Sequence, residues 1–211
     1  MPKETERKFL VRDLDVIAGL TGSCIDQKYL QDEPVSVHVF RVEDRAWLMV
    51  TTPSGSGEET VTHWFDIPTN EAEELLATYA PRGLLDNSKV VIRCRIEDGK
   101  GMFAIKGPTR GISRDEFEYP VPLGMANHWM AIAAPATHKT RYRIPVGEFV
   151  FEVDVFRKAL AGLVMAEVEL DQSAAEVPLP AWLGAEVSHD PRYFNSNLAK
   201  CSAPPDFATS P

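Results

Sequence analysis

The sequence predicts a fold of the α+β class, built mainly from antiparallel strands with few helices. Two observations lead to this prediction. Most segments between turns alternate charged or polar residues with apolar ones, with the period of two that is typical of strands. Consecutive segments are joined by short turns at residues 43–45 and 98–101, which favour hairpins over the long crossovers that parallel strands require.

Composition narrows the class of protein. The chain has 211 residues, 44% hydrophobic and 25% charged, which is enough for one domain with a core of its own. A net charge of −9 argues against general attraction to nucleic acid or to anionic membranes, although a local basic site could still bind anions. The three cysteines, Cys24, Cys94 and Cys201, lack the spacing of a disulfide framework, and no apolar run reaches transmembrane length. We therefore expect a cytoplasmic protein whose partner is neither nucleic acid nor a membrane.

The first strand, residues 4–11, shows the alternation most clearly. Glu4, Glu6 and Lys8 share one face, whereas Phe9 and Val11 share the other. Two acids and a base in one row are unusual for a face that packs into a core. We therefore expect this face to line a hydrated cavity that contains ions. The other expected strands are residues 24–31, two within 35–53, 60–67, 90–97, 102–106, 113–119, 138–144, 149–156 and 165–170, with helices at 70–79 and 126–133.

Six strands pair a charged face with a largely apolar one. Their charged rows are Glu4-Glu6-Lys8, Arg93-Arg95, Arg114-Glu116-Glu118, Lys139-Arg141-Arg143, Glu152-Asp154 and Glu167-Glu169, and Lys106 stands alone on its strand. An open sheet with a solvated charged face is the commonest arrangement for such strands. The alternative is a closed barrel with the charges inside, hydrated and paired with each other, with metal ions or with a polyanion. The sorting into basic, acidic and mixed rows favours the barrel.

The two kinds of charge suit one chemistry. Lysine and arginine side chains match phosphate oxygens, arginine bidentately and lysine as a point charge. Carboxylates are hard oxygen ligands suited to Mg²⁺ or Mn²⁺. Bases for polyphosphate and carboxylates for a divalent metal are the parts that metal-assisted phosphoryl transfer requires.

Several motifs carry a resemblance to a known family. The opening ETERK matches the Glu-x-Glu-x-Lys signature of the CYTH superfamily, the triphosphate tunnel metalloenzymes, and IRCR, AIKGP, SRDEFEY, KTRY, FEVDVF, AEVEL and RYFNSNL follow in the expected order. The chain resembles this family over residues 3–31 and 90–198. The resemblance implies an eight-stranded antiparallel tunnel barrel with outer helices. It also implies an enzyme that hydrolyses inorganic triphosphate, thiamine triphosphate or RNA 5′-triphosphates, or that cyclises ATP.

The resemblance implies a role for each matching residue. The implied metal ligands for Mg²⁺ or Mn²⁺ are Glu4, Glu6, Glu116, Glu118, Asp154, Glu167 and Glu169, with the last three as the main set. The implied substrate-binding residues are Lys8, Arg93, Arg95, Lys106, Arg114, Lys139, Arg141 and Arg143. Glu4, Glu6, Lys8 and Lys139 are the implied catalytic residues. We expect metal-dependent hydrolysis of inorganic tripolyphosphate; thiamine triphosphate hydrolysis, ATP cyclisation and non-catalytic polyphosphate or nucleotide binding are the alternatives.

One segment departs from the family. RVEDRAWLMVTTP followed by WFDIP resembles RIEDGKGMFAIKGP followed by EFEYPVP, which predicts a degenerate repeat at residues 35–82 inserted in a single domain of residues 1–200; chance similarity is the alternative. In this copy Val39, Thr51, Thr62 and Trp64 replace Arg93, Lys106, Glu116 and Glu118, and Arg41 matches Arg95. We therefore expect the copy outside the tunnel, packed on the barrel or forming a homodimer surface through Trp47, Trp64 and Phe65. Residues 201–211 are expected to form a loose tail.

Overall fold

The computed structural model describes residues 2–30, 33–54, 59–171 and 176–206. The strands are β1 (Lys3–Val11), β2 (Ser23–Tyr29), β3 (Ser36–Val42), β4 (Arg45–Pro53), β5 (Thr60–Asp66), β6 (Val91–Glu97), β7 (Lys100–Lys106), β8 (Ser113–Val121), β9 (Ala136–Val146), β10 (Phe149–Phe156), β11 (Val164–Glu169) and β12 (Leu183–Glu186). The α-helices are α1 (Thr69–Thr78), α2 (Leu123–Ile132) and α3 (Asn195–Leu198), and short 3₁₀ turns lie at η1 (Asp15–Ile17), η2 (Lys158–Leu160) and η3 (Pro191–Tyr193).

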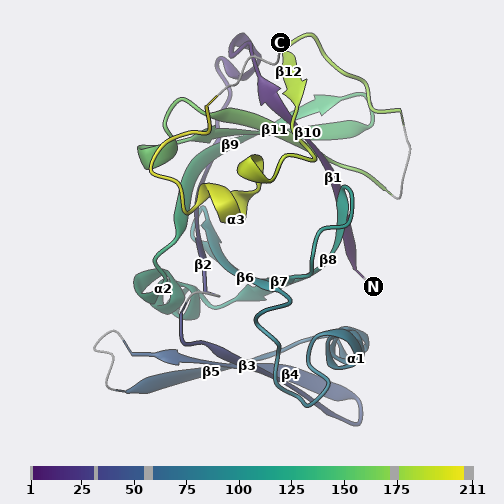
Figure 1. Ribbon diagram of the computed structural model, residues 1–211, viewed down its shortest axis with the longest axis vertical. Coiled ribbons are helices and arrows are strands. Elements are labelled where there is room, and N and C mark those ends of the chain that lie inside the picture. The colour runs from purple at the N-terminus through teal and green to yellow at the C-terminus, as the bar shows by residue number, and fades with distance from the viewer. Residues whose placement is uncertain (1, 31–32, 55–58, 172–175, 207–211) are drawn as a thin grey trace. The chain divides into compact units, whose positions relative to one another are not determined.

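The strands belong to two sheets (Figure 1). β3, β4 and β5 form a three-stranded sheet, and the others follow the order β11-β10-β9-β2-β6-β7-β8-β1-β12. β1 also pairs with β11, in antiparallel register, so that eight strands close on themselves and β12 is added to β1. This strand order confirms the predicted α+β fold with an eight-stranded antiparallel barrel.

The chain divides into two compact units, which we describe separately. Unit 1 contains the described residues of Met1–Lys3, Gln27–Thr109 and Arg114–Ala134. Unit 2 contains those of Glu4–Asp26, Arg110–Ser113 and Pro135–Pro211.

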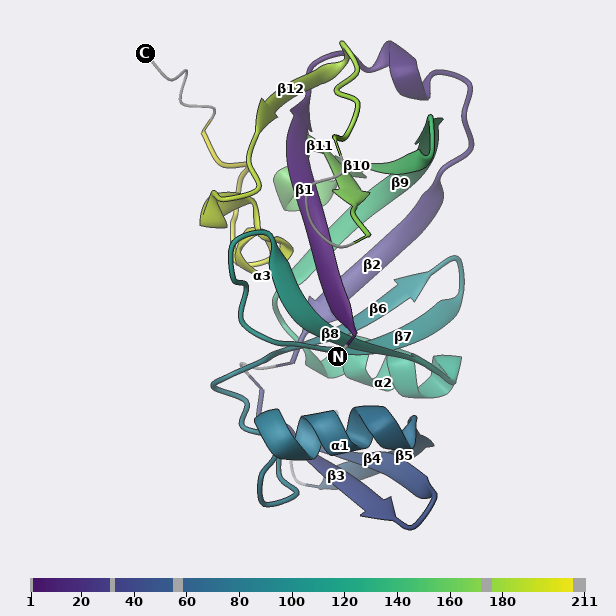
Figure 2. The same cartoon turned by 90° about the vertical axis from the view of Figure 1, so that its right-hand side faces the viewer.

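Unit 1 is built from two antiparallel meanders, β3–β5 and β6–β8, with α1 and α2 between them (Figure 2). Leu48 of β4, Leu75 of α1, Phe103 of β7 and Trp129 of α2 are fully buried in one continuous hydrophobic core. The apolar faces of both meanders therefore stabilise each other through the helices. The predicted insertion at residues 35–82 supplies β3, β4, β5 and α1 to this core.

The three aromatic residues expected to anchor that segment lie on opposite faces of its sheet. Phe65 packs against Phe103, Tyr119 and Trp129, with ring centroids 5.4, 6.0 and 6.3 Å away. Trp64 is 49% exposed on the other face, where it and Trp47 contact Phe40. Phe65 therefore packs mainly into the core, whereas Trp64 is the most exposed of the three and lies with Trp47 on the opposite face.

The strand register corrects the alignment between the two meanders. Glu43 and Asp98 both adopt positive φ, 54° and 45°, in matching hairpin turns. Aligning these turns equates Arg95 with Phe40, so the expected match of Arg95 with Arg41 is wrong by one residue. Because successive strand residues face opposite sides, Arg41 lies on the helix-covered face and pairs with Glu73 of α1 at 2.8 Å.

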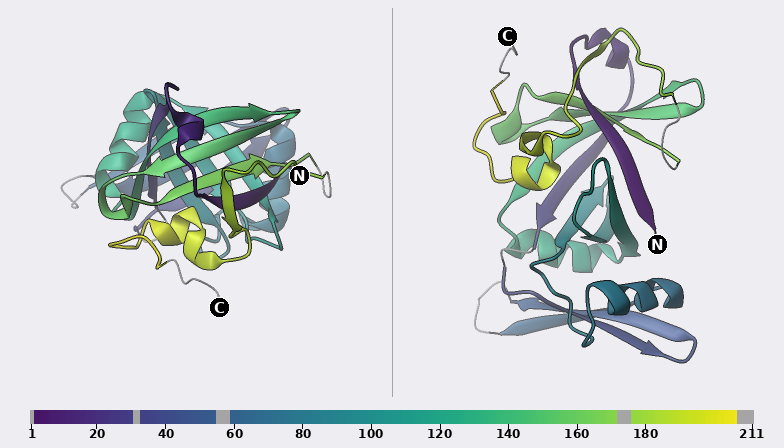
Figure 3. Two further views of the ribbon diagram at one scale, coloured as in Figure 1. Left: turned by 90° about the horizontal axis from the view of Figure 1, so that it is seen from above. Right: turned by 45° about the vertical axis from the view of Figure 1, so that its right-hand side comes forward.

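Unit 2 contains β9, β10, β11, most of β1 and a C-terminal segment that folds back beside these strands (Figure 3). Apolar side chains from alternate strand positions form one core cluster that includes Phe9, Phe151 and Val168. A second cluster joins Met165 of β11 to Tyr193 of η3 and Leu198 of α3. This packing fixes the turn at which α3 begins.

Among the described residues, none of the helices is long and apolar enough to span a membrane. The three cysteines are free thiols, and burial raises the pKa of Cys94 to about 12.

A partly buried histidine in unit 1 predicts that the stability of the protein depends on pH. Burial, and then the neighbouring His128, lower the pKa of His63, whose Nε2 is shielded from solvent with no hydrogen-bond partner among the described residues. The unfolded chain therefore binds the proton more readily, and stability falls as the pH drops below about 6.5. We expect the urea midpoint to fall between pH 7.5 and pH 5 by more in the wild type than in His63→Phe. Equal shifts in the two proteins would contradict this assignment.

Candidate active site

Strand register brings the charged rows of unit 2 onto one side. Lys8 of β1 lies opposite Glu167 of β11, and Glu167 in turn lies opposite Glu152 of β10. Asp154 lies opposite Arg141 of β9. Residues directly opposite one another in an antiparallel pair project to the same face, so the rows of four adjacent strands meet.

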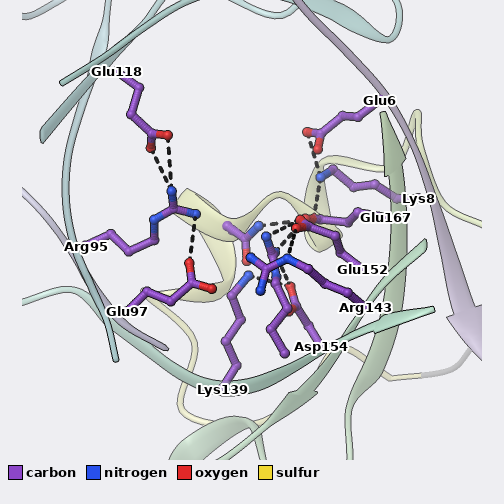
Figure 4. A network of polar contacts seen from close by, with 12 residues as sticks. Glu6, Lys8, Arg95, Glu97, Glu118, Lys139, Arg143, Glu152, Asp154 and Glu167 are labelled. Carbon is purple, nitrogen blue, oxygen red and sulfur yellow. Dashed lines mark hydrogen bonds and ion pairs between the residues drawn. The ribbon is translucent and has the colours of Figure 1, made fainter. Parts of the chain in front are cut away.

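Lys8 links two carboxylates of this face. Its Nζ lies 2.7 Å from Glu6 Oε1 and 2.5 Å from Glu167 Oε1 (Figure 4). The lysine is 6% exposed. Burial acts to lower the pKa of Lys8, but the charges of Glu167 and Glu6 outweigh it and raise the pKa above its ordinary value. Lys8 is thus a fixed positive charge at neutral pH.

Arg141 is the centre of the cluster. Its Nε and Nη2 each donate to Asp154 at 2.7 Å, and Nη2 also donates to Glu167 Oε2 at 3.1 Å. Nη1 donates to Glu152, which also accepts from Arg143 Nε at 3.1 Å. One guanidinium therefore holds carboxylates from two strands.

Lys139 and Asp154 form the most buried ion pair of the cluster, each being 1% exposed. Burial and the adjacent Arg141 lower the pKa of Lys139 despite the attraction of Asp154. Burial alone would raise the pKa of Glu167, but Lys8, Lys139 and Arg141 hold it well below its ordinary value. Asp154 and Glu167 therefore form part of a buried network with several cations.

This network, which we call the β9–β11 cluster, is balanced in formal charge. Its cations are Lys8, Lys139, Arg141 and Arg143, and its carboxylates are Glu6, Glu152, Asp154 and Glu167. Buried charges are tolerated when they are paired and hydrogen-bonded in this way. Because the charges of the cluster are already paired, an anion or a cation that binds here must displace one of the present ion-pair partners.

Unit 1 carries a second network on β6–β8, which we call the β6–β8 cluster. Arg93 Nη2 lies 2.7 Å from Glu118 Oε1 and 3.3 Å from Glu116 Oε1. Lys106 Nζ lies 2.8 Å from Glu116. Arg95 lies between Glu118, at 3.1 Å, and Glu97, at 3.8 Å (Figure 4). Three cations and three carboxylates are again matched.

The remaining predicted site residues lie on the same faces as these clusters. Glu4 precedes Glu6 by two positions on β1, and Arg114 precedes Glu116 by two on β8; both are partly buried. Glu169 lies opposite Glu6 in the β1–β11 register and is exposed. Each takes part in a polar interaction. Glu169, expected as a main metal ligand, is thus more open to solvent than Asp154 and Glu167.

Comparison with known proteins identifies the family of this chain. The model of the CYTH domain family matches residues 73–198. The chain belongs to the CYTH family. An inorganic triphosphatase of Acetivibrio thermocellus is 43% identical over 111 residues, which cover 52% of this chain and 71% of that protein. An inorganic triphosphatase of Nitrosomonas europaea is 34% identical over 141 residues, covering 64% of this chain and 93% of that protein.

Solved structures add a weaker similarity. The crystal structure of an inorganic triphosphatase aligns with 93% of this CYTH chain and 97% of its own, with 24% sequence identity and a TM-score of 0.48. At that score the family assignment rests on the family model and the two sequence relatives.

The carboxylates of this CYTH protein have the oxygen chemistry that Mg²⁺ and Mn²⁺ prefer. Among the described residues, no three Asp, Glu, His or Cys side chains are gathered as a ready-made cation site. In both clusters lysine and arginine side chains already contact the carboxylates. One further oxygen, Asn195 Oδ1, is buried beside Glu167 without a hydrogen-bond partner in the described part of the chain. The donor set therefore fits a divalent cation if the carboxylates give up cationic partners.

The sequence patterns gave no role to two residues at these clusters, Glu97 and Asn195. Glu97 continues the row of Arg93 and Arg95, so strand periodicity carried its signal. Glu152 was counted with Asp154 among the carboxylates suited to a divalent cation, although it was not named as a metal ligand. Asn195 follows a 3₁₀ turn, where no strand or helix period applies, and only its place within RYFNSNL marked it.

Proposed function

We propose that this protein hydrolyses inorganic tripolyphosphate to pyrophosphate and phosphate with Mg²⁺ or Mn²⁺ as cofactor. The observation that carries the proposal is the β9–β11 cluster, in which four carboxylates hold three buried cations, Lys8, Lys139 and Arg141, and the exposed Arg143. The two sequence relatives named inorganic triphosphatase support the same reaction.

Substrate binding in this proposal is an exchange of partners. Phosphate oxygens replace carboxylate oxygens on Lys8, Lys139 and Arg141, and the planar guanidinium of Arg141 can bind two phosphate oxygens at once. The basic side chains are preorganised, because the free energy needed to bury them is already offset when the protein folds. Arg143, which is more exposed than Arg141, binds phosphate at the outer side of the cluster.

The exchange frees the carboxylates that would hold the metal: Glu6, Glu152, Asp154 and Glu167, with Glu4 and Glu169 on the same faces. When bound, the cation supplies Lewis-acid polarisation of a phosphoryl oxygen. Glu4 and Glu6 accept hydrogen bonds from the attacking water and take up its proton as the new P–O bond forms. The bond from the terminal phosphorus to the bridging oxygen breaks, and pyrophosphate leaves while the lysine and arginine side chains neutralise its charge.

We propose that the β6–β8 cluster also binds phosphate, through Arg93, Arg95 and Lys106, together with Arg114 on the same face of β8. Glu116 and Glu118 then hold these bases or a second cation. Lys106→Ala should lower kcat/KM for tripolyphosphate by about 10- to 100-fold, the effect of losing one charge-assisted hydrogen bond to substrate. Lys100→Ala, on the exposed end of the same strand, is the matched control and should leave kcat/KM unchanged. Steady-state phosphate release measures both, and equal values for the two variants would remove Lys106 from the site.

A substrate panel tests the function itself. Phosphate release is measured from tripolyphosphate, thiamine triphosphate, ATP and pyrophosphate with Mg²⁺, with Mn²⁺ and with EDTA, together with cyclic AMP formation from ATP. We expect tripolyphosphate to have the highest kcat/KM and EDTA to abolish turnover. Preference for thiamine triphosphate or formation of cyclic AMP would reassign the substrate, and no turnover of any triphosphate would refute the enzyme.

The chain organisation remains a proposal of the same kind. We propose a single CYTH domain over residues 1–200, with residues 35–82 as an inserted degenerate repeat and residues 201–211 as a tail; residues 207–211 lie outside the described part. The sheet face with Trp47 and Trp64 is the proposed homodimer surface, which sedimentation of wild type and Trp64→Ser can test. We propose a cytoplasmic location, in line with three free thiols.

A further inference from the structure

One buried oxygen beside the β9–β11 cluster has no hydrogen-bond partner among the residues that the structure describes. Asn195 is the first residue of α3, directly after the turn at η3. Tyr193 and Leu198 on either side of it are buried in the cluster with Met165. Apolar packing of these two neighbours therefore fixes the backbone on both sides of Asn195.

The two ends of the Asn195 amide can be told apart by chemistry. Nδ2 donates to Glu167 Oε1 at 3.2 Å, the same oxygen that binds Lys8 Nζ. Glu167 also accepts from Arg141, so it is a carboxylate that can only accept. Exchanging the amide oxygen and nitrogen would place two acceptors against each other, and the assignment is thereby fixed.

The other end, Oδ1, is shielded from solvent and has no hydrogen-bond partner within the residues that the structure describes. A buried acceptor left without a donor costs about 1–3 kcal/mol, so such groups are normally satisfied by a ligand, an ion or water. Ionised phosphate oxygens cannot satisfy it because they are acceptors themselves. A divalent cation can, since amide and carboxylate oxygens together are common ligands of Mg²⁺ and Mn²⁺.

We propose that Asn195 is a ligand of the divalent cation, binding it through Oδ1 next to Glu167. This inference rests on the proposed metal-dependent function. It assigns to Asn195 two contacts: Nδ2 orients Glu167, and Oδ1 completes the set of oxygens around the cation. A neutral ligand here adds affinity without adding negative charge close to the bound polyphosphate.

Mn²⁺ binding, measured by electron paramagnetic resonance of the full chain, tests the proposal. Asn195→Ala should weaken Mn²⁺ binding about tenfold or more. Asn195→Asp keeps an oxygen at the same place but loses the N–H bond to Glu167, and it should bind Mn²⁺ at least as tightly as the wild type. Asn197→Ala is the matched control, since this asparagine of the same helix is exposed and its Nδ2 donates to the Pro191 carbonyl, away from Glu167.

The outcomes separate the inference from the function on which it rests. Unchanged Mn²⁺ affinity in Asn195→Ala would overturn the ligand, and equal weakening in Asn195→Ala and Asn195→Asp would show that Asn195 acts only by positioning Glu167. If the wild type hydrolyses tripolyphosphate with Mn²⁺ in either case, the proposed function stands without this ligand. If the wild type binds no Mn²⁺ and turns over no triphosphate, the proposed function itself fails. Circular dichroism melting curves check that each variant is folded.

Discussion

Glu167→Gln should lower kcat for tripolyphosphate by about 100- to 1,000-fold, the usual effect of removing one preorganised charged group from a reacting centre. Glu167 contacts Lys8, Arg141 and Asn195, so it connects the bases, the proposed metal ligands and β1. Glutamine has nearly the same shape but no charge for a cation. Lys8 keeps Glu6 and Arg141 keeps Asp154, so the chain should still fold. Phosphate release with saturating Mn²⁺ measures the loss.

The matched control for this substitution is Glu186→Gln. Glu186 also accepts from an arginine, with Arg7 Nη2 at 2.6 Å, but Arg7 lies on the opposite face of β1 from Lys8. The control loses an ion pair of similar geometry outside the cluster and should keep wild-type turnover. A Glu167→Gln protein as active as Glu186→Gln would exclude Glu167 from catalysis.

Asp154→Ala should be the most destabilising change in the cluster, with a loss of about 3–5 kcal/mol in the free energy of unfolding. Asp154 is 1% exposed and accepts from both Lys139 and Arg141. Its removal leaves Lys139, itself 1% exposed, as a buried cation without its carboxylate partner. Urea denaturation at pH 7.5 gives the difference from the wild type.

Asp66→Ala is the corresponding control on the surface. Asp66 pairs with Arg45 at 3.8 Å, and both side chains are largely exposed, so solvent screens the interaction. Its loss should change stability by less than about 0.5 kcal/mol. Similar denaturation midpoints for the two variants would mean that the Asp154 pairs contribute no more than a surface ion pair.

The sequence by itself determined the strand faces, the family and the kind of charge at each site position. Glu6 and Lys8 share a face because neighbours two apart in a strand always do, and this rule needs no knowledge of the rest of the fold. The same rule placed Arg141 with Arg143 and Glu167 with Glu169. Periodicity is local information, so a single sequence is enough to read it.

Only the tertiary structure decided which charges meet. Arg141 contacts Glu152, Asp154 and Glu167 because the β9–β10 and β10–β11 registers place them side by side, and registers depend on pairing across long distances in the chain. The same reason explains the one-residue error that equated Arg41 with Arg95. Asn195 reaches Glu167 through the apolar packing of α3, which no repeating pattern encodes. The face of a strand on which a residue lies follows from the local sequence, whereas the side chains that it contacts depend on the tertiary fold.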